Sequence, residues 1–229
     1  MAAGNPDIDL PTLLEISING ALFDIANVIH YIFKDEYVSA RLKNKLWFKY
    51  DGNKWKQVEE GPYYELSTTI ITHYEEFLKE LLLKETICQS DLTKDNFDTD
   101  NDLIKNNLKL VQVDISKTNT IIEKLKNVNF KESLCKECLY LFYDRDFISK
   151  LDKCEHLICF KDKVYDLKTH TFRLGTKNDM MSIYIDTNYT APDTEESQTV
   201  FNDLVNDFTM FRKGLLKKRH PKNIYTVNI

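Results

Sequence analysis

The sequence predicts an α+β fold that is predominantly helical and carries small antiparallel hairpins near residues 46–58 and 157–174. Three observations predict this class. Apolar residues recur every three or four positions over most of the chain, as amphipathic helices require. Two short stretches instead concentrate aromatic and β-branched residues around turn sequences. With 42% apolar residues, a chain of 229 residues can bury one core or two small ones.

Seven segments show the helical spacing of apolar residues. They are residues 11–16, 21–33, 66–88, 103–111, 121–125, 134–142 and 200–208. Pro11 suits the first turn of a helix, and segment 21–33 has a wide apolar stripe. These segments place most of the chain in helices.

Short strands are predicted where this spacing stops. The clearest turn is Asp51-Gly52, which separates aromatic-rich runs at 46–50 and 53–58. Four further apolar runs predict strands, at residues 157–160, 164–167, 171–174 and 182–186. The strands therefore fall into two regions among the helices.

A two-residue turn at Asp51-Gly52 would pair Phe48 with Trp55 and give the hairpin two different faces. The second face would carry a tryptophan among lysines: Trp47, Lys49, Lys54 and Lys56. Such a ring can stack on a nucleobase while the ammonium groups contact phosphates. A hairpin with one face packed on helices and the other solvated fits the same pattern. A three-residue turn would shift the pairing, so these alternatives stay open.

The C-terminal segment differs from the rest in charge. We predict one domain over residues 1–190, and a linker, a short helix and a basic tail over 191–229. Residues 212–229 include six basic and no acidic residues, although the whole chain has a net charge of −5. Candidate phosphate contacts in this tail are Arg212, Lys213, Lys217, Lys218 and Arg219. A linker to a further domain and an unstructured end are the alternatives.

Several function classes lack their sequence signatures. None of the six glycines stands in a G-x-x-x-x-G-K-[ST] or G-x-G-x-x-G motif, so we predict no nucleotide cofactor. The sequence has no run of 18 apolar residues and no signal-peptide pattern. Five cysteines, an odd number, fit free thiols in a reducing compartment. We expect an intracellular protein without a membrane span.

The cysteines also allow a zinc hypothesis. Cys135 and Cys138 form a C-x-x-C pair, and Cys154, His156 and Cys159 follow. Cys138 lies in a predicted helical stripe and Cys159 in a predicted strand, where thiols pack as small buried groups. We therefore predict no metal site, with structural zinc as the alternative.

Four stretches occur in an order that resembles a known family. They are residues 24–30, residues 47–55, residues 157–167 and residues 172–189. The second has the form W-x-x-Y-D-G-x-x-W. Together they resemble the domain that precedes the superfamily 3 helicase in poxvirus-type primase-helicases of nucleocytoplasmic large DNA viruses and in related phage primases. That family usually has Asn-Gly where this chain has Lys161-Asp162-Lys163.

The resemblance implies a replication module without catalytic residues, within a parent primase-helicase that hydrolyses NTP. Such a domain lies beside the helicase ring, helps it assemble and contacts single-stranded DNA. Its implied partners are the helicase and primase domains or subunits, with a homo-oligomer as an alternative, in the host cytoplasm or at a viral replication site. Two other functions remain open: a protein–protein interaction or regulatory module without nucleic-acid binding, and an enzyme in its own right.

Overall fold

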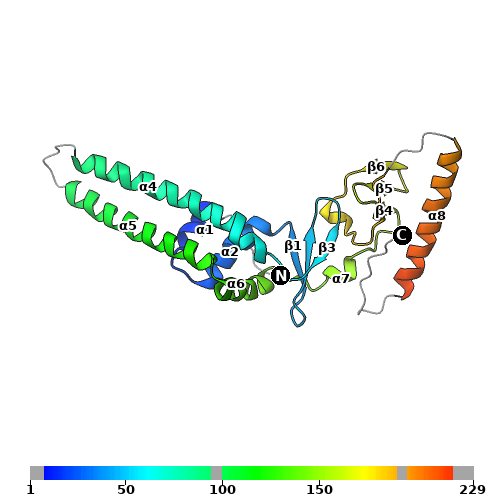
Figure 1. Cartoon of the computed structure of the whole chain (residues 1–229), viewed down its shortest axis with the longest axis horizontal. Coiled ribbons are helices and arrows are strands. Elements are labelled where there is room, and N and C mark those ends of the chain that lie inside the picture. Colours follow the sequence, from blue (N-terminus) through cyan, green and yellow to red (C-terminus); the bar gives the residue numbers. More distant parts are fainter. Residues whose placement is uncertain (1–7, 94–99, 190–194, 219–229) are drawn as a thin grey trace. The chain divides into compact units, whose positions relative to one another are not determined.

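The computed structural model describes residues 8–93, 100–189 and 195–218 and divides the chain into two compact units (Figure 1). Unit 1 consists of Met1–Lys34 and Glu60–Tyr143, and unit 2 of Asp35–Glu59 and Asp144–Ile229. Each unit thus combines two separate stretches of chain. The predicted boundary at residues 190 and 191 lies outside the described residues.

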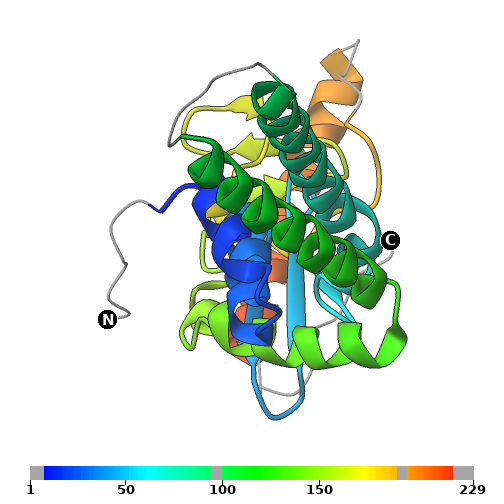
Figure 2. The same cartoon turned by 90° about the vertical axis from the view of Figure 1, so that its left-hand side faces the viewer.

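Unit 1 is helical in its described residues. Its elements are α1 (Leu10–Ser17), α2 (Leu22–Phe33), α3 (Tyr63–Glu65), the π-helix η1 (Leu66–Ile70), α4 (Ile71–Thr93), α5 (Asp100–Leu125) and α6 (Val128–Leu141). Helices α4 and α5 lie side by side along their length (Figure 2), and α2 packs against α1 and α6. The two helical patterns predicted at 103–111 and 121–125 belong to the single helix α5.

The core of unit 1 follows the predicted apolar stripe of α2. Ile25, Val28 and Ile29 are completely buried on this helix. Ser17 of α1 and Tyr74 of α4 share a buried hydrogen bond of 2.7 Å between their hydroxyl oxygens. Burial raises the pKa of the Tyr74 hydroxyl, so it remains a neutral partner for Ser17. This bond ties the first helix to the long α4 helix.

His30 makes the stability of unit 1 depend on pH. Burial, reinforced by the charge of Lys34, lowers the pKa of His30, whose ring packs edge-on against Phe142 at 4.8 Å. The unfolded chain therefore binds the His30 proton more readily, so the stability contributed by the neutral ring is lost as the pH falls below about 6.5. We expect the thermal midpoint of unit 1, followed by circular dichroism at 222 nm, to fall between pH 7.5 and 5.5.

The control for this pH effect compares two histidine variants. His30→Phe keeps an aromatic ring against Phe142 but removes the titrating group, and should flatten the pH profile. His73→Gln, which changes a histidine of α4 that lies 3.9 Å from Glu76, is the control for replacing a histidine elsewhere in unit 1. An identical pH profile in wild type and His30→Phe would contradict the prediction.

Unit 2 contains both sheets. The first is formed by β1 (Tyr37–Arg41), β2 (Leu46–Tyr50) and β3 (Trp55–Val58), and the second by β4 (Leu157–Cys159), β5 (Val164–Asp166) and β6 (Thr171–Arg173). Both are antiparallel, with the strands paired in chain order. The remaining elements are α7 (Phe147–Lys150), the short helix η2 (Lys177–Asp179) and α8 (Glu195–Lys218). The predicted α+β class with two small antiparallel sheets is confirmed.

Each sheet of unit 2 has its own hydrophobic cluster. Around the first sheet, Phe48 and Trp55 pack against Phe147 and Leu151. Around the second sheet, six residues cluster: Ile158, Phe160, Tyr165, Ile183, Ile185 and Val205. Val205 belongs to α8, so this helix contributes to the packing of the second sheet.

Several elements differ from their predictions, and the short helices α3, α7 and η2 were not predicted. Strand β1 was not predicted, because its buried Ser39 and Ala40 lack the β-branched or aromatic character of a strand. The predicted strand at 182–186 is wrong: Ile185 forms a single bridge to Phe160, and the amide of Ser182 bonds to a side chain instead of a ladder. Helix α8 spans 24 residues, far more than the predicted short helix at 200–208.

None of the described helices is both long enough and apolar enough to cross a membrane.

Candidate functional site

The turn between β2 and β3 is organised by Asp51. Its Oδ1 atom accepts hydrogen bonds from the amides of Asn53 at 3.1 Å and Lys54 at 2.9 Å, and its own amide donates to the Lys54 carbonyl at 3.0 Å. Gly52 has φ +91°, a conformation that side chains rarely adopt. The Asp-Gly pair therefore begins a four-residue turn.

This turn changes the register of the hairpin. Tyr50 pairs with Trp55, and Phe48 pairs with Gln57. The predicted pairing of Phe48 with Trp55 is wrong, because the turn has four residues. A two-residue turn would pair each β2 residue with the β3 residue two positions earlier in the sequence.

The tryptophan and lysines predicted on one open face occupy different environments. Trp47 is 2% exposed and lies edge-on to the Tyr37 ring, over which the Lys49 ammonium lies at 5.0 Å. Lys54 is 1% exposed, and Lys56 is exposed and contacts Asp51 Oδ2 at 2.8 Å. The burial of Trp47 and Lys54 leaves neither accessible for the stacking and phosphate contact predicted for them. Contact of Lys49 and Lys56 with DNA stays a prediction.

Lys54 is held inside unit 2 by three groups. Its Nζ atom donates to the Lys161 carbonyl at 3.0 Å, lies 4.1 Å from the centre of the Tyr184 ring and is 3.5 Å from Asp51 Oδ2. A buried ammonium requires such compensation by hydrogen bonds, a ring face and a carboxylate. The side chain therefore joins the first hairpin to the second sheet region.

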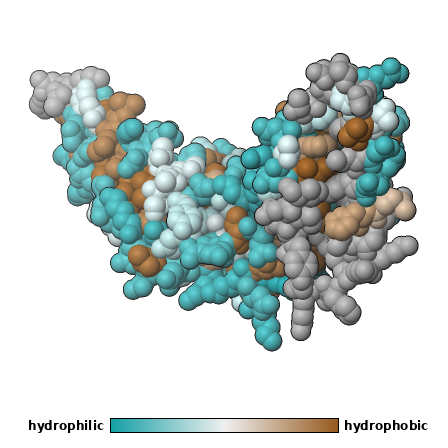
Figure 3. All heavy atoms as spheres, turned by 45° about the vertical axis from the view of Figure 1, so that its right-hand side comes forward, coloured by the Kyte–Doolittle hydropathy of each residue, from teal (hydrophilic) through white to brown (hydrophobic). Residues whose placement is uncertain are grey.

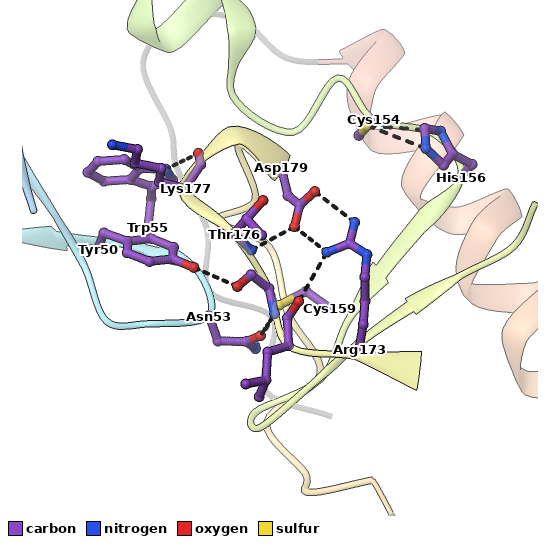
Figure 4. Close-up of polar contacts among 12 residues, drawn as sticks. Tyr50, Asn53, Trp55, Cys154, His156, Cys159, Arg173, Thr176, Lys177 and Asp179 are labelled. Carbon is purple, nitrogen blue, oxygen red and sulfur yellow. Dashed lines mark hydrogen bonds and ion pairs between the residues drawn. The ribbon is translucent and has the colours of Figure 1, made fainter. Parts of the chain in front are cut away.

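Asn53 forms the centre of the connection shown in Figure 4. Its Oδ1 atom accepts from the Gly175 amide at 2.8 Å. Its Nδ2 atom donates to the Phe160 carbonyl at 3.0 Å. Tyr50 Oη donates to the Gly175 carbonyl at 2.9 Å. A Cβ atom on Gly175 would collide with the Asn53 backbone. Trp55 Nε1 donates to the Lys177 carbonyl at 3.0 Å. We name Tyr50, Asn53, Trp55 and Gly175 the hairpin clasp.

An ion pair fixes residues 173–179, the segment that contains Gly175 of the clasp. Arg173 contacts both carboxylate oxygens of Asp179, at 2.7 and 2.8 Å, and the Thr176 amide donates to Asp179 Oδ2 at 2.7 Å (Figure 4). Burial opposes ionisation of Asp179, but the hydrogen bonds from Arg173 and Thr176 outweigh it and lower the pKa of this carboxyl. The loop after β6 is therefore held in one conformation.

The candidate zinc ligands are divided between the two units. Cys135 and Cys138 belong to α6 in unit 1, where burial raises the pKa of the Cys138 thiol, whereas Cys154, His156 and Cys159 belong to unit 2. The Cys154 sulfur lies 3.9 Å from both ring nitrogens of His156. The described residues contain no group of three or more His, Cys, Asp or Glu side chains that could hold a metal ion.

Of the predicted basic tail, four residues lie in α8: Arg212, Lys213, Lys217 and Lys218. Arg219 lies outside the described residues. Their contact with nucleic acid stays a prediction.

Sequence reasoning missed the two residues that complete the connections within unit 2. The sequence could have indicated Gly175, because an isolated glycine next to a predicted strand often marks a place where two backbones approach closely. Asp152 is completely buried, and its carboxylate accepts hydrogen bonds from Ser182 and Ile183. No local pattern distinguishes it from an ordinary surface aspartate.

The comparisons with known proteins agree with the family suggested by the four sequence stretches. The family described as D5 N terminal like matches residues 26–210. The chain is 27% identical over 209 residues to "Putative helicase L207/L206" of Acanthamoeba polyphaga mimivirus, covering 91% of this chain and 19% of that protein. It is 25% identical over 203 residues to "Putative helicase 121R" of Invertebrate iridescent virus 3, covering 84% of this chain and 21% of that protein.

The chain thus spans about a fifth of the length of these two relatives. The family match includes the aromatic hairpin, both sheets and the segment of residues 173–179 that contains Gly175 of the clasp. Because this match covers most of the sequence, the chain belongs to the D5 N-terminal-like family.

Proposed function

We propose that this chain is a noncatalytic accessory domain of a viral replicative DNA helicase-primase, which assembles with the helicase and primase parts and contacts single-stranded DNA. One observation carries the proposal. Proteins named as helicases contain a segment similar to nearly all of this chain, and about four-fifths of their length lies outside that segment. We assign unwinding and NTP hydrolysis to that remainder and assembly to the segment.

The hairpin clasp supports a scaffolding role. Tyr50 and Trp55 are two of the specified positions of the W-x-x-Y-D-G-x-x-W motif, and Asn53 lies between them; all three form hydrogen bonds within unit 2. Residues held in this way position other parts of a protein and do not need to touch a substrate. The motif is thus explained by the shape of unit 2 that it maintains.

A protein–protein interaction module without nucleic-acid binding is the second candidate. Apolar side chains lie exposed along the α4–α5 pair of unit 1 (Figure 3). Six of them have exposed fractions between 44% and 63%: Leu82, Leu83, Ile87, Leu103, Leu110 and Val113. A surface of this kind suits contact with another protein surface. The occupant that we propose is the remainder of the helicase-primase, since the relatives extend far beyond the matched segment.

A chimera tests the accessory role. We replace the matching segment of the mimivirus relative with this chain, and compare DNA-stimulated ATP hydrolysis and oligomeric state with those of a deletion of the segment. The chimera should retain both properties and the deletion should lose them. ATP hydrolysis by the purified chain alone, or full activity of the deletion, would contradict the proposal.

Two leucines test the proposed protein contact within the same chimera. Leu83→Ser with Leu110→Ser changes two side chains that are each 63% exposed, and should weaken assembly without unfolding unit 1. Leu174→Ser is the matched control, because Leu174 is 70% exposed in unit 2. Equal assembly of both variants would exclude the α4–α5 pair as the contact.

A further inference from the structure

The turn between β1 and β2 concentrates positive charge in an acidic protein. Residues 37–50 contain four basic and no acidic side chains: Arg41, Lys43, Lys45 and Lys49. Figure 1 shows the turn projecting beyond the strands. Lys43 and Lys45 are exposed at its tip, and no ion pair is recorded for either among the described residues. Two neighbouring ammonium groups are thus available to an anionic partner.

The backbone at Lys45 is unfavourable for a lysine. Its φ is +47°, in the left-handed region that favours glycine, and its amide closes the turn on the Leu42 carbonyl at 3.3 Å. A turn selected for stability alone would carry glycine or asparagine at this position. Strain of this kind concentrates where a side chain is needed for another purpose.

Two acidic residues that border the first sheet have no ion pair with the turn among the described residues. Asp144 donates its amide to the Ser39 carbonyl on β1, but its carboxylate contacts Lys150 at 3.4 Å. Glu59 follows the last residue of β3, beside the start of β2, and forms no ion pair within the part of the chain that the structure describes. The described charges therefore leave the tip positive.

We propose that the β1–β2 turn binds the phosphodiester backbone of single-stranded DNA through Lys43 and Lys45. This inference rests on the proposed function and assigns its DNA contact to a place that the sequence motifs did not indicate. Lysine recognises phosphate as a point charge, without reading base sequence. The turn therefore contributes affinity that depends on salt and not on sequence.

The test measures binding of a fluorescent 20-nucleotide oligothymidine to the full chain by anisotropy at several salt concentrations. Lys43→Gln with Lys45→Gly should lower the affinity on the order of tenfold at 0.1 M salt. It should also reduce the salt slope by about 1.4, since each phosphate contact with a single strand contributes about 0.7. The matched control is Lys163→Gln with Lys168→Gln, which removes two exposed charges elsewhere in unit 2.

A second measurement separates loss of contact from loss of fold. Lys45→Gly alone should raise the thermal midpoint of unit 2, because glycine relieves the strained φ, while it weakens DNA binding. Equal loss of affinity in the control pair, or no loss in the turn variant, would overturn the assignment to this turn. If the wild-type chain does not bind the oligonucleotide, the whole DNA contact fails, whereas assembly in the chimera is measured independently.

Discussion

Replacing Trp55 by alanine is expected to lower the free energy of unfolding of unit 2 by about 4 kcal/mol. The ring is 4% exposed and packs against Phe147 at a centroid distance of 5.1 Å. Its Nε1 atom donates to the Lys177 carbonyl at 3.0 Å. Alanine would leave a cavity between the first sheet and α7, and would leave that carbonyl without its donor.

Tryptophan fluorescence measures this effect specifically. The only two tryptophans, Trp47 and Trp55, both lie in unit 2, so Trp47 remains as the reporter in the variant. Urea denaturation should show an earlier fluorescence transition, while the circular dichroism signal of helical unit 1 changes little.

Trp55→Phe provides the matched control for packing. It keeps an aromatic ring but loses the indole donor, and should cost about 1.5 kcal/mol. If Trp55→Ala destabilised unit 2 no more than Trp55→Phe, the cavity would not be the main cause.

The helices were predictable because their signal is local. The spacing of Ile25, Val28 and Ile29 within a single segment indicates both a helix and its buried face, and the structure buries all three completely. The hairpin was predictable for the same reason, since Asp51-Gly52 between aromatic runs indicates a turn. Its register was not, because two-residue and four-residue turns begin with the same residues.

The clasp could not be predicted, because its partners lie far apart in the sequence. Asn53 and Gly175 are 122 residues apart, and Lys54 and Lys161 are 107 apart. Neither pair has a local pattern that identifies its partner. The prediction of an exposed Lys54 failed for this reason: strand alternation assigns a face of the hairpin, but it does not say what covers that face.

Asp152→Ala is expected to cost unit 2 about 4 kcal/mol. The Asp152 side chain is completely buried, and its Oδ1 atom accepts from the amides of Ser182 at 2.6 Å and Ile183 at 2.9 Å. Alanine would leave both amides without an acceptor. Asp152 also has φ +57°, in the left-handed region. Alanine has no polar side chain to form the local hydrogen bonds that make this conformation tolerable, so the substitution adds backbone strain.

Asp152→Asn distinguishes what the hydrogen bonds contribute to the stability of unit 2 from what the charge contributes. Asparagine tolerates the left-handed conformation and keeps an oxygen for both amides, while the Ser182 hydroxyl can turn to accept from its Nδ2 atom. The loss should then be about 1 kcal/mol, measured by the same fluorescence transition. Equal losses for the alanine and asparagine variants would show that the charge matters and the amide contacts do not.

Asp152 and Trp55 act on the same short segment. The Trp55 amide donates to the Met181 carbonyl at 2.7 Å, and the Asp152 amide donates to the Met180 carbonyl at 2.6 Å. Both residues therefore hold the backbone of Met180 and Met181 in place. Because the two share this segment, the double variant Trp55→Ala with Asp152→Ala should be destabilised by less than the sum of the single variants. Additive losses would mean that the hairpin and the Asp152 loop are held independently.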